Sequence, residues 1–126
     1  MIGGVRSVGI HVGDQDRAKA FWTEQVGFEL VQDSPFGEGD DPPRWIVVKP
    51  PADDTNLVLF TPDEAKHLVG TFSNVLFWAD DINATYEALT AKGIEFPEAP
   101  SRQFWGWWAV FKDPDGNTYG LGQRGD

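Results

Sequence analysis

Gly27-Phe28-Glu29-Leu30 follows a segment with helical apolar spacing, and Gly93-Ile94-Glu95-Phe96 repeats this arrangement 66 residues further along the chain, from position 27 to position 93. Each glycine stands where a helix is expected to end, because glycine adopts the left-handed conformation of a helix C-terminus without strain. An N-capping aspartate precedes each helix, Asp14 in the first copy and Asp80 or Asp81 in the second. The repeat predicts two similar modules, neither of which buries its apolar face alone.

Each copy is expected to contain a strand, a helix and then three further strands. The opening strands are predicted over residues 5–12 and 74–79. The later strands are predicted over residues 28–31, 45–48 and 57–60 in the first copy and over residues 95–96, 104–111 and 117–121 in the second. An acidic loop rich in proline and glycine is predicted over residues 33–43. We therefore expect one domain, residues 1–126, made of module one (1–61), a linker (62–72) and module two (73–126).

Composition limits the partners that this chain can have. It has 126 residues, 40% of them hydrophobic, which suffices for a sizeable core. The net charge is −10, so neither nucleic acid nor an anionic membrane is an expected partner. The absence of cysteine excludes disulfides, thiolate catalysis and cysteine-ligated zinc. No apolar run reaches the ~18 residues of a membrane span, and the chain begins without a signal peptide, so a cytoplasmic location is expected.

Two polar side chains of the first strand are expected on the same face. Ser7 and His11 are four positions apart, so strand alternation directs both to the same face, away from Val8 and Ile10. His11 is a candidate general base or hydrogen-bonding group for a ligand. It is equally explained as a structural histidine held by a neighbouring hydroxyl or carboxylate.

Tryptophans are concentrated in the predicted strands. Trp45, Trp105 and Trp108 lie on strands or at their entries, and Trp78 shares its strand face with Asn74. Aromatic walls suit flat or cationic ligands, although core or interface packing explains any single tryptophan equally well. Trp22 belongs to the apolar stripe of the first helix and is expected in the core.

Four segments in this order resemble the vicinal oxygen chelate superfamily, which includes glyoxalase I, extradiol dioxygenases and bleomycin-resistance proteins. They are Val12-Gly13-Asp14-Gln15-Asp16, Ala20-Phe21-Trp22-Thr23 with Gly27-Phe28, Ala79-Asp80-Asp81-Ile82, and Phe111-Lys112-Asp113-Pro114-Asp115-Gly116-Asn117. The resemblance implies an α+β fold in which two βαβββ modules form an open, barrel-like mixed sheet around a cleft. It also implies a homodimer.

The resemblance also indicates where the metal-dependent relatives carry their ligands. Matched strand to strand, these positions fall on Ser7, near Leu59, on Asn74 and on Gly120. Leucine and glycine offer no ligand atom, and serine and asparagine are poor substitutes for imidazole and carboxylate. We therefore expect no metal, no other cofactor and no catalytic residue from the family pattern.

The resulting hypothesis is a metal-independent protein that binds a small molecule, aromatic or cationic, as bleomycin-resistance proteins sequester a cationic glycopeptide. The predicted ligand-binding residues are Ser7, His11, Trp45, Asn74, Trp78, Trp105 and Trp108. One alternative is a lyase, isomerase or dioxygenase of this superfamily that uses other metal ligands or His11 as a base. A second alternative is an interaction module whose cleft is vestigial.

Overall fold

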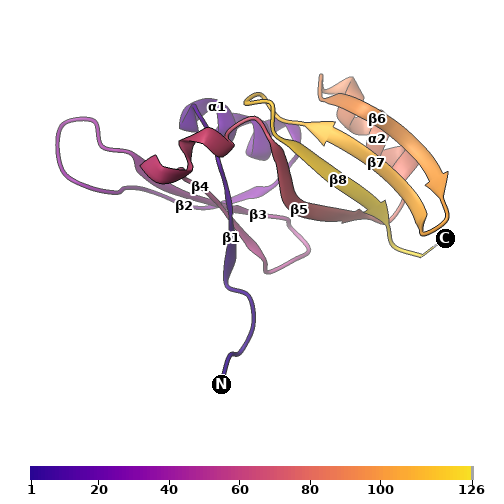
Figure 1. The fold of residues 1–126 in the computed structure, drawn as a ribbon, viewed down its shortest axis with the longest axis horizontal. Coiled ribbons are helices and arrows are strands. Elements are labelled where there is room, and N and C mark those ends of the chain that lie inside the picture. The colour runs from indigo at the N-terminus through magenta and orange to yellow at the C-terminus, as the bar shows by residue number, and fades with distance from the viewer. Residues whose placement is uncertain (126) are drawn as a thin grey trace. The chain divides into compact units, whose positions relative to one another are not determined.

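The computed structural model describes residues 1–125, which form two compact units divided in the sequence between Val69 and Gly70 (Figure 1). Each unit contains a strand, a helix and three further strands, and its four strands form one mixed sheet. The predicted α+β class with two open sheets is confirmed. We keep the names module one and module two for the units, and the predicted linker is divided between them. No helix within residues 1–125 is long and apolar enough to cross a membrane.

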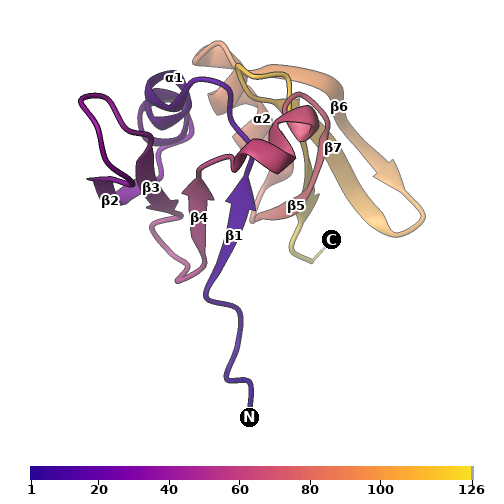
Figure 2. The same ribbon diagram turned by 60° about the vertical axis from the view of Figure 1, so that its left-hand side comes forward.

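Module one has the sheet order β1-β4-β3-β2, with β1 parallel to β4 and the other pairs antiparallel (Figure 2). Its elements are β1 (Ser7–Ile10), α1 (Gln15–Ala20), the π-helical η1 (Phe21–Gln25), β2 (Glu29–Pro35), β3 (Arg44–Lys49), β4 (Asn56–Leu59) and the 3₁₀ helix η2 (Asp63–Leu68). The Asp14 carboxylate caps α1 by accepting a 3.0 Å hydrogen bond from the Arg17 amide. Gly27 ends the helical segment with φ at 90°, as the repeat predicts.

The core of module one lies between its sheet and α1 with η1. The buried side chains include Ile10, Phe21, Trp22, Ile46, Leu57 and Leu59. Trp22 is 0% exposed, which confirms its predicted place in the core. Because strand side chains alternate, the intervening residues of β1, β3 and β4 lie on the opposite face. We call this the helix-free face of module one.

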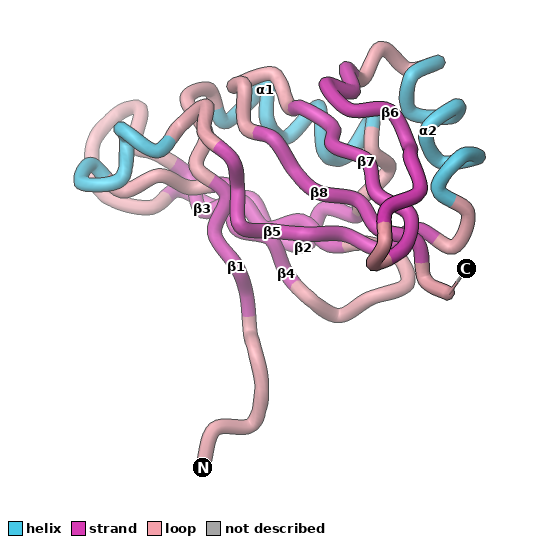
Figure 3. The backbone as a smooth tube through the Cα atoms, turned by 45° about the vertical axis from the view of Figure 1, so that its right-hand side comes forward, coloured by secondary structure: helices cyan, strands magenta, loops and turns pink. Residues whose placement is uncertain are grey.

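Module two repeats this arrangement with the sheet order β5-β8-β7-β6, in which β5 is parallel to β8. Its elements are β5 (Phe72–Ala79), α2 (Ile82–Ala91), β6 (Glu95–Gln103), β7 (Gly106–Lys112) and β8 (Thr118–Gln123) (Figure 3). Asp81, rather than Asp80, caps α2 by accepting a 3.1 Å hydrogen bond from the Ala84 amide. Helix α2 packs on one face of the sheet and leaves the other as the helix-free face of module two.

β2 and β6 run more than three residues beyond their predicted ends. β2 continues to Pro35 by pairing with β3, and Asp33 in this extension forms ion pairs with Lys19 at 2.8 Å and Arg44 at 3.0 Å. The hydrogen bond from Lys19 lowers the pKa of Asp33. The Asp33 carboxylate therefore stabilises module one and does not belong to an acidic loop. β6 extends from Glu95 to Gln103 despite Pro97 and Pro100, which an irregular edge strand tolerates because its outer amides have no ladder partner.

The turn between β7 and β8 is built around a buried carboxylate. Asp113 is 5% exposed and accepts four hydrogen bonds. Its Oδ1 accepts from the Asp115 and Asn117 amides at 2.9 Å, and its Oδ2 accepts from Asn117 Nδ2 at 2.9 Å and the Tyr119 hydroxyl at 2.6 Å. Burial raises the pKa of Asp113, so ionisation of this carboxyl opposes folding and the four donors offset that cost.

We predict that Tyr119→Phe lowers the free energy of unfolding by about 1–3 kcal/mol at pH 7, because a buried carboxylate loses a donor. The loss should shrink as the pH falls through the raised pKa of Asp113, since a protonated carboxyl depends less on its donors. Urea unfolding at several pH values measures both effects. Tyr86→Phe, at the only other tyrosine, is the matched control, and equal losses in the two variants would contradict this role of Tyr119.

Candidate functional site

The helix-free face of module two carries large apolar side chains. Along β5, Leu76 and Trp78 are exposed, whereas Phe77 between them packs in the core, 5.9 Å from both the Phe111 and Tyr119 rings. Asn74 lies on the same face as Leu76 and Trp78, as the strand alternation predicts. The pairing of β5 with β8 and of β8 with β7 adds Trp108 to this face.

Trp108 lies directly over a glycine of the neighbouring strand. A Cβ atom on Gly120 would stand 2.2 Å from Cη2 of Trp108 and 2.6 Å from Cδ2 of Leu76. Both distances are too short for any real contact, so position 120 has no room for a side chain while these two keep their places. Any side chain at position 120 would therefore force Trp108 and Leu76 to shift.

Trp78 also lies beside a glycine of β8, but at a longer distance than Trp108. A Cβ atom on Gly122 would lie 3.5 Å from Cζ3 of Trp78, an ordinary van der Waals distance. The Arg124 guanidinium lies 5.6 Å from the centre of the Trp78 ring, within the range of a cation–π contact. Trp78 is nevertheless 65% exposed, so much of the indole remains accessible.

The turn between β6 and β7 adds two further rings. The Trp105 ring stands edge-on to Trp108 at 6.3 Å, and Phe104 stands edge-on to Trp105 at 4.8 Å. Trp105 is 58% exposed and Phe104 is 97% exposed. We call the surface formed by Leu76, Trp78, Trp105 and Trp108 the indole face of module two.

Module one brings its predicted site residues to one face of its sheet. The pairing of β1 with β4 and of β4 with β3 places Ser7, Trp45 and His11, one residue beyond β1, on the helix-free face. Trp45 packs in a cluster with Phe36 and Phe60, where the three ring-to-ring distances are 5.0 to 5.4 Å. Phe36 is 51% exposed, so this cluster also presents an aromatic surface.

The positions at which relatives carry metal ligands do not fit a metal here. Leu59, near which the second position falls, is 0% exposed and faces the core. Its neighbour Val58 occupies the helix-free face and offers no ligand atom either. Gly120 has no space for a ligand side chain because Trp108 lies over it. Within residues 1–125, no three His, Cys, Asp or Glu side chains gather at a possible metal site.

The sequence pattern did not reveal the residues that support the site. Gly120 and Gly122 alternate on one strand face, a pattern that indicates a large group lying across the strand. Phe36 and Phe60 are partners of Trp45 that the sequence does not identify, because one lies in the segment predicted as a loop and the other at a strand end. The roles of the seven predicted residues in ligand binding stay predictions.

Comparison with known proteins identifies the family. The model of the Glyoxalase/Bleomycin resistance protein/Dioxygenase superfamily matches residues 4–121. The uncharacterised protein YetH of Bacillus subtilis (strain 168) is 36% identical over 119 residues, which cover 94% of this chain and 97% of YetH.

Two solved structures are also similar over nearly their whole length. TnmS3, an antibiotic binding protein from Streptomyces sp. CB03234, is 36% identical with a TM-score of 0.85, and the match covers 98% of each chain. UcmS2 is 32% identical with a TM-score of 0.83, and the match covers 97% of this chain and 98% of UcmS2. Sequence, repeat and architecture agree, and the chain belongs to the glyoxalase/bleomycin resistance protein/dioxygenase superfamily.

Proposed function

We propose that this protein binds a flat aromatic small molecule on the indole face of module two, without a metal. The observation that carries the proposal is the packing of Trp108 over Gly120, which replaces a ligand position of the metal-dependent relatives with an indole. Trp78 and Trp105 flank this part of the sheet and remain more than half exposed. Stacking against such rings favours a planar ligand.

The similarity to TnmS3 supports an antibiotic as the ligand class. TnmS3 is described as an antibiotic binding protein and is 36% identical over nearly the full length of both chains. The net charge of −10 favours a cationic or neutral compound over an anionic one at this surface. A role in sequestration, by binding the compound without changing it, follows from these two properties. The homodimer and the cytoplasmic location expected from the sequence stay predictions.

An enzymatic role would need a different chemical basis. The lyase, isomerase and dioxygenase alternatives require metal ligands at positions other than those that the family resemblance indicates. Two residues at those positions, Val58 and Gly120, offer no donor atom. His11 as a metal-free base stays a prediction. Leu76 and Trp78 are 58% and 65% exposed, which suits either ligand binding or protein contact, so the interaction-module alternative stays a prediction.

We predict that Trp78→Leu and Trp105→Leu each weaken binding of proflavine, a flat aromatic cation, by about fivefold, which corresponds to about 1 kcal/mol of lost stacking. Isothermal titration calorimetry measures the affinity, with bleomycin as a second probe and with EDTA present to remove metal. Trp107→Leu is the matched control, because β7 directs Trp107 to the opposite face from Trp108. An equal loss in the control, or binding abolished by EDTA, would refute the proposal.

We also predict that Gly120→Ala destabilises the protein by about 1–3 kcal/mol and weakens proflavine binding, because the new methyl group displaces the Trp108 indole. Gly122→Ala is the matched control on the same strand, since its methyl group meets Trp78 at 3.5 Å. This variant should change stability by less than about 1 kcal/mol. Urea unfolding and calorimetry test the pair, and indistinguishable alanine variants would show that the Trp108 contact is not a constraint.

A further inference from the structure

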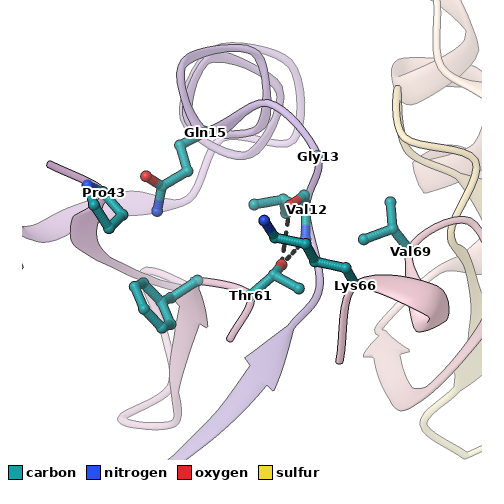
Figure 4. A pocket seen from close by; sticks show the side chains of 8 residues that line it. Val12, Gly13, Gln15, Pro43, Thr61, Lys66 and Val69 are labelled. Atoms are coloured by element: carbon teal, nitrogen blue, oxygen red, sulfur yellow. Dashed lines mark hydrogen bonds between the residues drawn. The ribbon is translucent and has the colours of Figure 1, made fainter. Parts of the chain in front are cut away.

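Module one contains a cavity of about 430 Å³ that none of the seven predicted site residues lines directly (Figure 4). It is lined by Val12, Gly13, Gln15, Pro43, Phe60, Thr61, Lys66 and Val69. These residues come from the β1–α1 connection, the start of α1, the segment before β3, the end of β4 and η2. The volume falls in the range of pockets that hold small organic ligands.

The polar wall groups of this cavity already have partners that hold the walls in place. The Gln15 side chain donates to the carbonyls of Arg44 at 2.6 Å and Leu59 at 2.8 Å, and it accepts from the Arg44 amide at 2.9 Å. The Thr61 hydroxyl accepts from the Val12 amide at 2.6 Å and donates to the Val12 carbonyl at 2.9 Å. These bonds join β1, β3, β4 and α1, so the cavity is formed before a ligand arrives.

The remaining walls are mainly apolar. Val12, Pro43, Phe60 and Val69 present aliphatic and aromatic carbon to the space. The Phe60 ring is fixed by Phe36 at 5.0 Å and by Trp45 at 5.4 Å. Binding of an apolar ligand would therefore not need to order this wall, and the entropic cost of binding would be lower.

Lys66 is the one charged residue among the eight that line the cavity. Its ammonium pairs with Asp63 at 3.0 Å, but this pair is at the surface, with side chains 70% and 92% exposed. Such exposed pairs contribute little free energy, and an ammonium can donate three hydrogen bonds. Figure 4 shows the Lys66 side chain reaching from η2 toward Val12 and Thr61.

We propose that this cavity is a second binding site, for a small carboxylate with an apolar body. The carboxylate would pair with the Lys66 ammonium, and the apolar body would contact Val12, Phe60 and Val69. The preference for an anion comes from the Lys66 ammonium at contact distance, whereas the net charge of −10 of the whole chain acts at longer range and disfavours an anion at both surfaces. The proposal does not rest on that of antibiotic binding, since the two surfaces belong to different modules.

The test uses the full chain and 4-phenylbutyrate, with its neutral amide as the matched compound. In nitrogen-15 NMR titrations the acid should shift the amide signals of Gly13 and Val69 and leave the side-chain indole signals of Trp78 and Trp105 unchanged. The amide should bind at least fivefold more weakly. Lys66→Met should weaken binding of the acid at least fivefold, and Lys66→Arg should restore most of the affinity.

Two further variants distinguish binding in the cavity from binding elsewhere on the chain. Asp63→Asn breaks the surface ion pair but keeps the ammonium, so it should bind the acid as well as, or better than, the unaltered protein. Trp78→Leu should leave binding of the acid unchanged, whatever it does to proflavine. The proposal is overturned if the acid and the amide bind equally, if Lys66→Met has no effect, or if the shifts appear at Trp78 and Trp105 instead of Gly13 and Val69.

Discussion

The close contact between Trp108 and Gly120 determines what module two can do. At most strand positions a side chain of some size fits, but position 120 has no room for one beneath the indole. The ring lies across two strands of the sheet, and Trp105 packs against its edge at 6.3 Å. A face that could have projected a hydrogen-bonding or metal-binding group is instead covered by carbon. The contact therefore leaves position 120 without a hydrogen-bonding or metal-binding side chain.

The two modules share a chain path but differ in chemistry. Both have an aspartate cap, a glycine with positive φ after the helix and the same strand order within their sheets. In module one the aromatic cluster of Phe36, Trp45 and Phe60 borders a cavity held by hydrogen bonds. In module two Trp108 and Trp78 lie beside Gly120 and Gly122, and Trp78 is exposed. The two modules therefore share a topology, while the side chains on their helix-free faces differ.

The fold could be predicted from local signals, whereas the site could be predicted only in part. The helix ends depend only on residues close in the sequence, so the cap at Asp14 and the positive φ angles of Gly27 and Gly93 follow directly from the sequence. Strand alternation also predicted that Asn74 and Trp78 share a face, and strand pairing adds Trp108 to it. The extent of β2 follows from its pairing with β3, which continues to Pro35 and Arg44. The support of Trp108 by Gly120 depends on strand pairing, which no local pattern specifies.

The two prolines of β6 have a consequence for how the sheet of module two can grow. β6 is an edge strand, and Pro97 and Pro100 remove two of its backbone donors, while its pairing with β7 is interrupted at two places. A foreign strand that approached this border would meet an incomplete and distorted row of hydrogen-bonding groups. β5, which forms the opposite border, carries no proline from Phe72 to Ala79. Strand addition, whether in assembly or in aggregation, is therefore directed to β5 and away from β6.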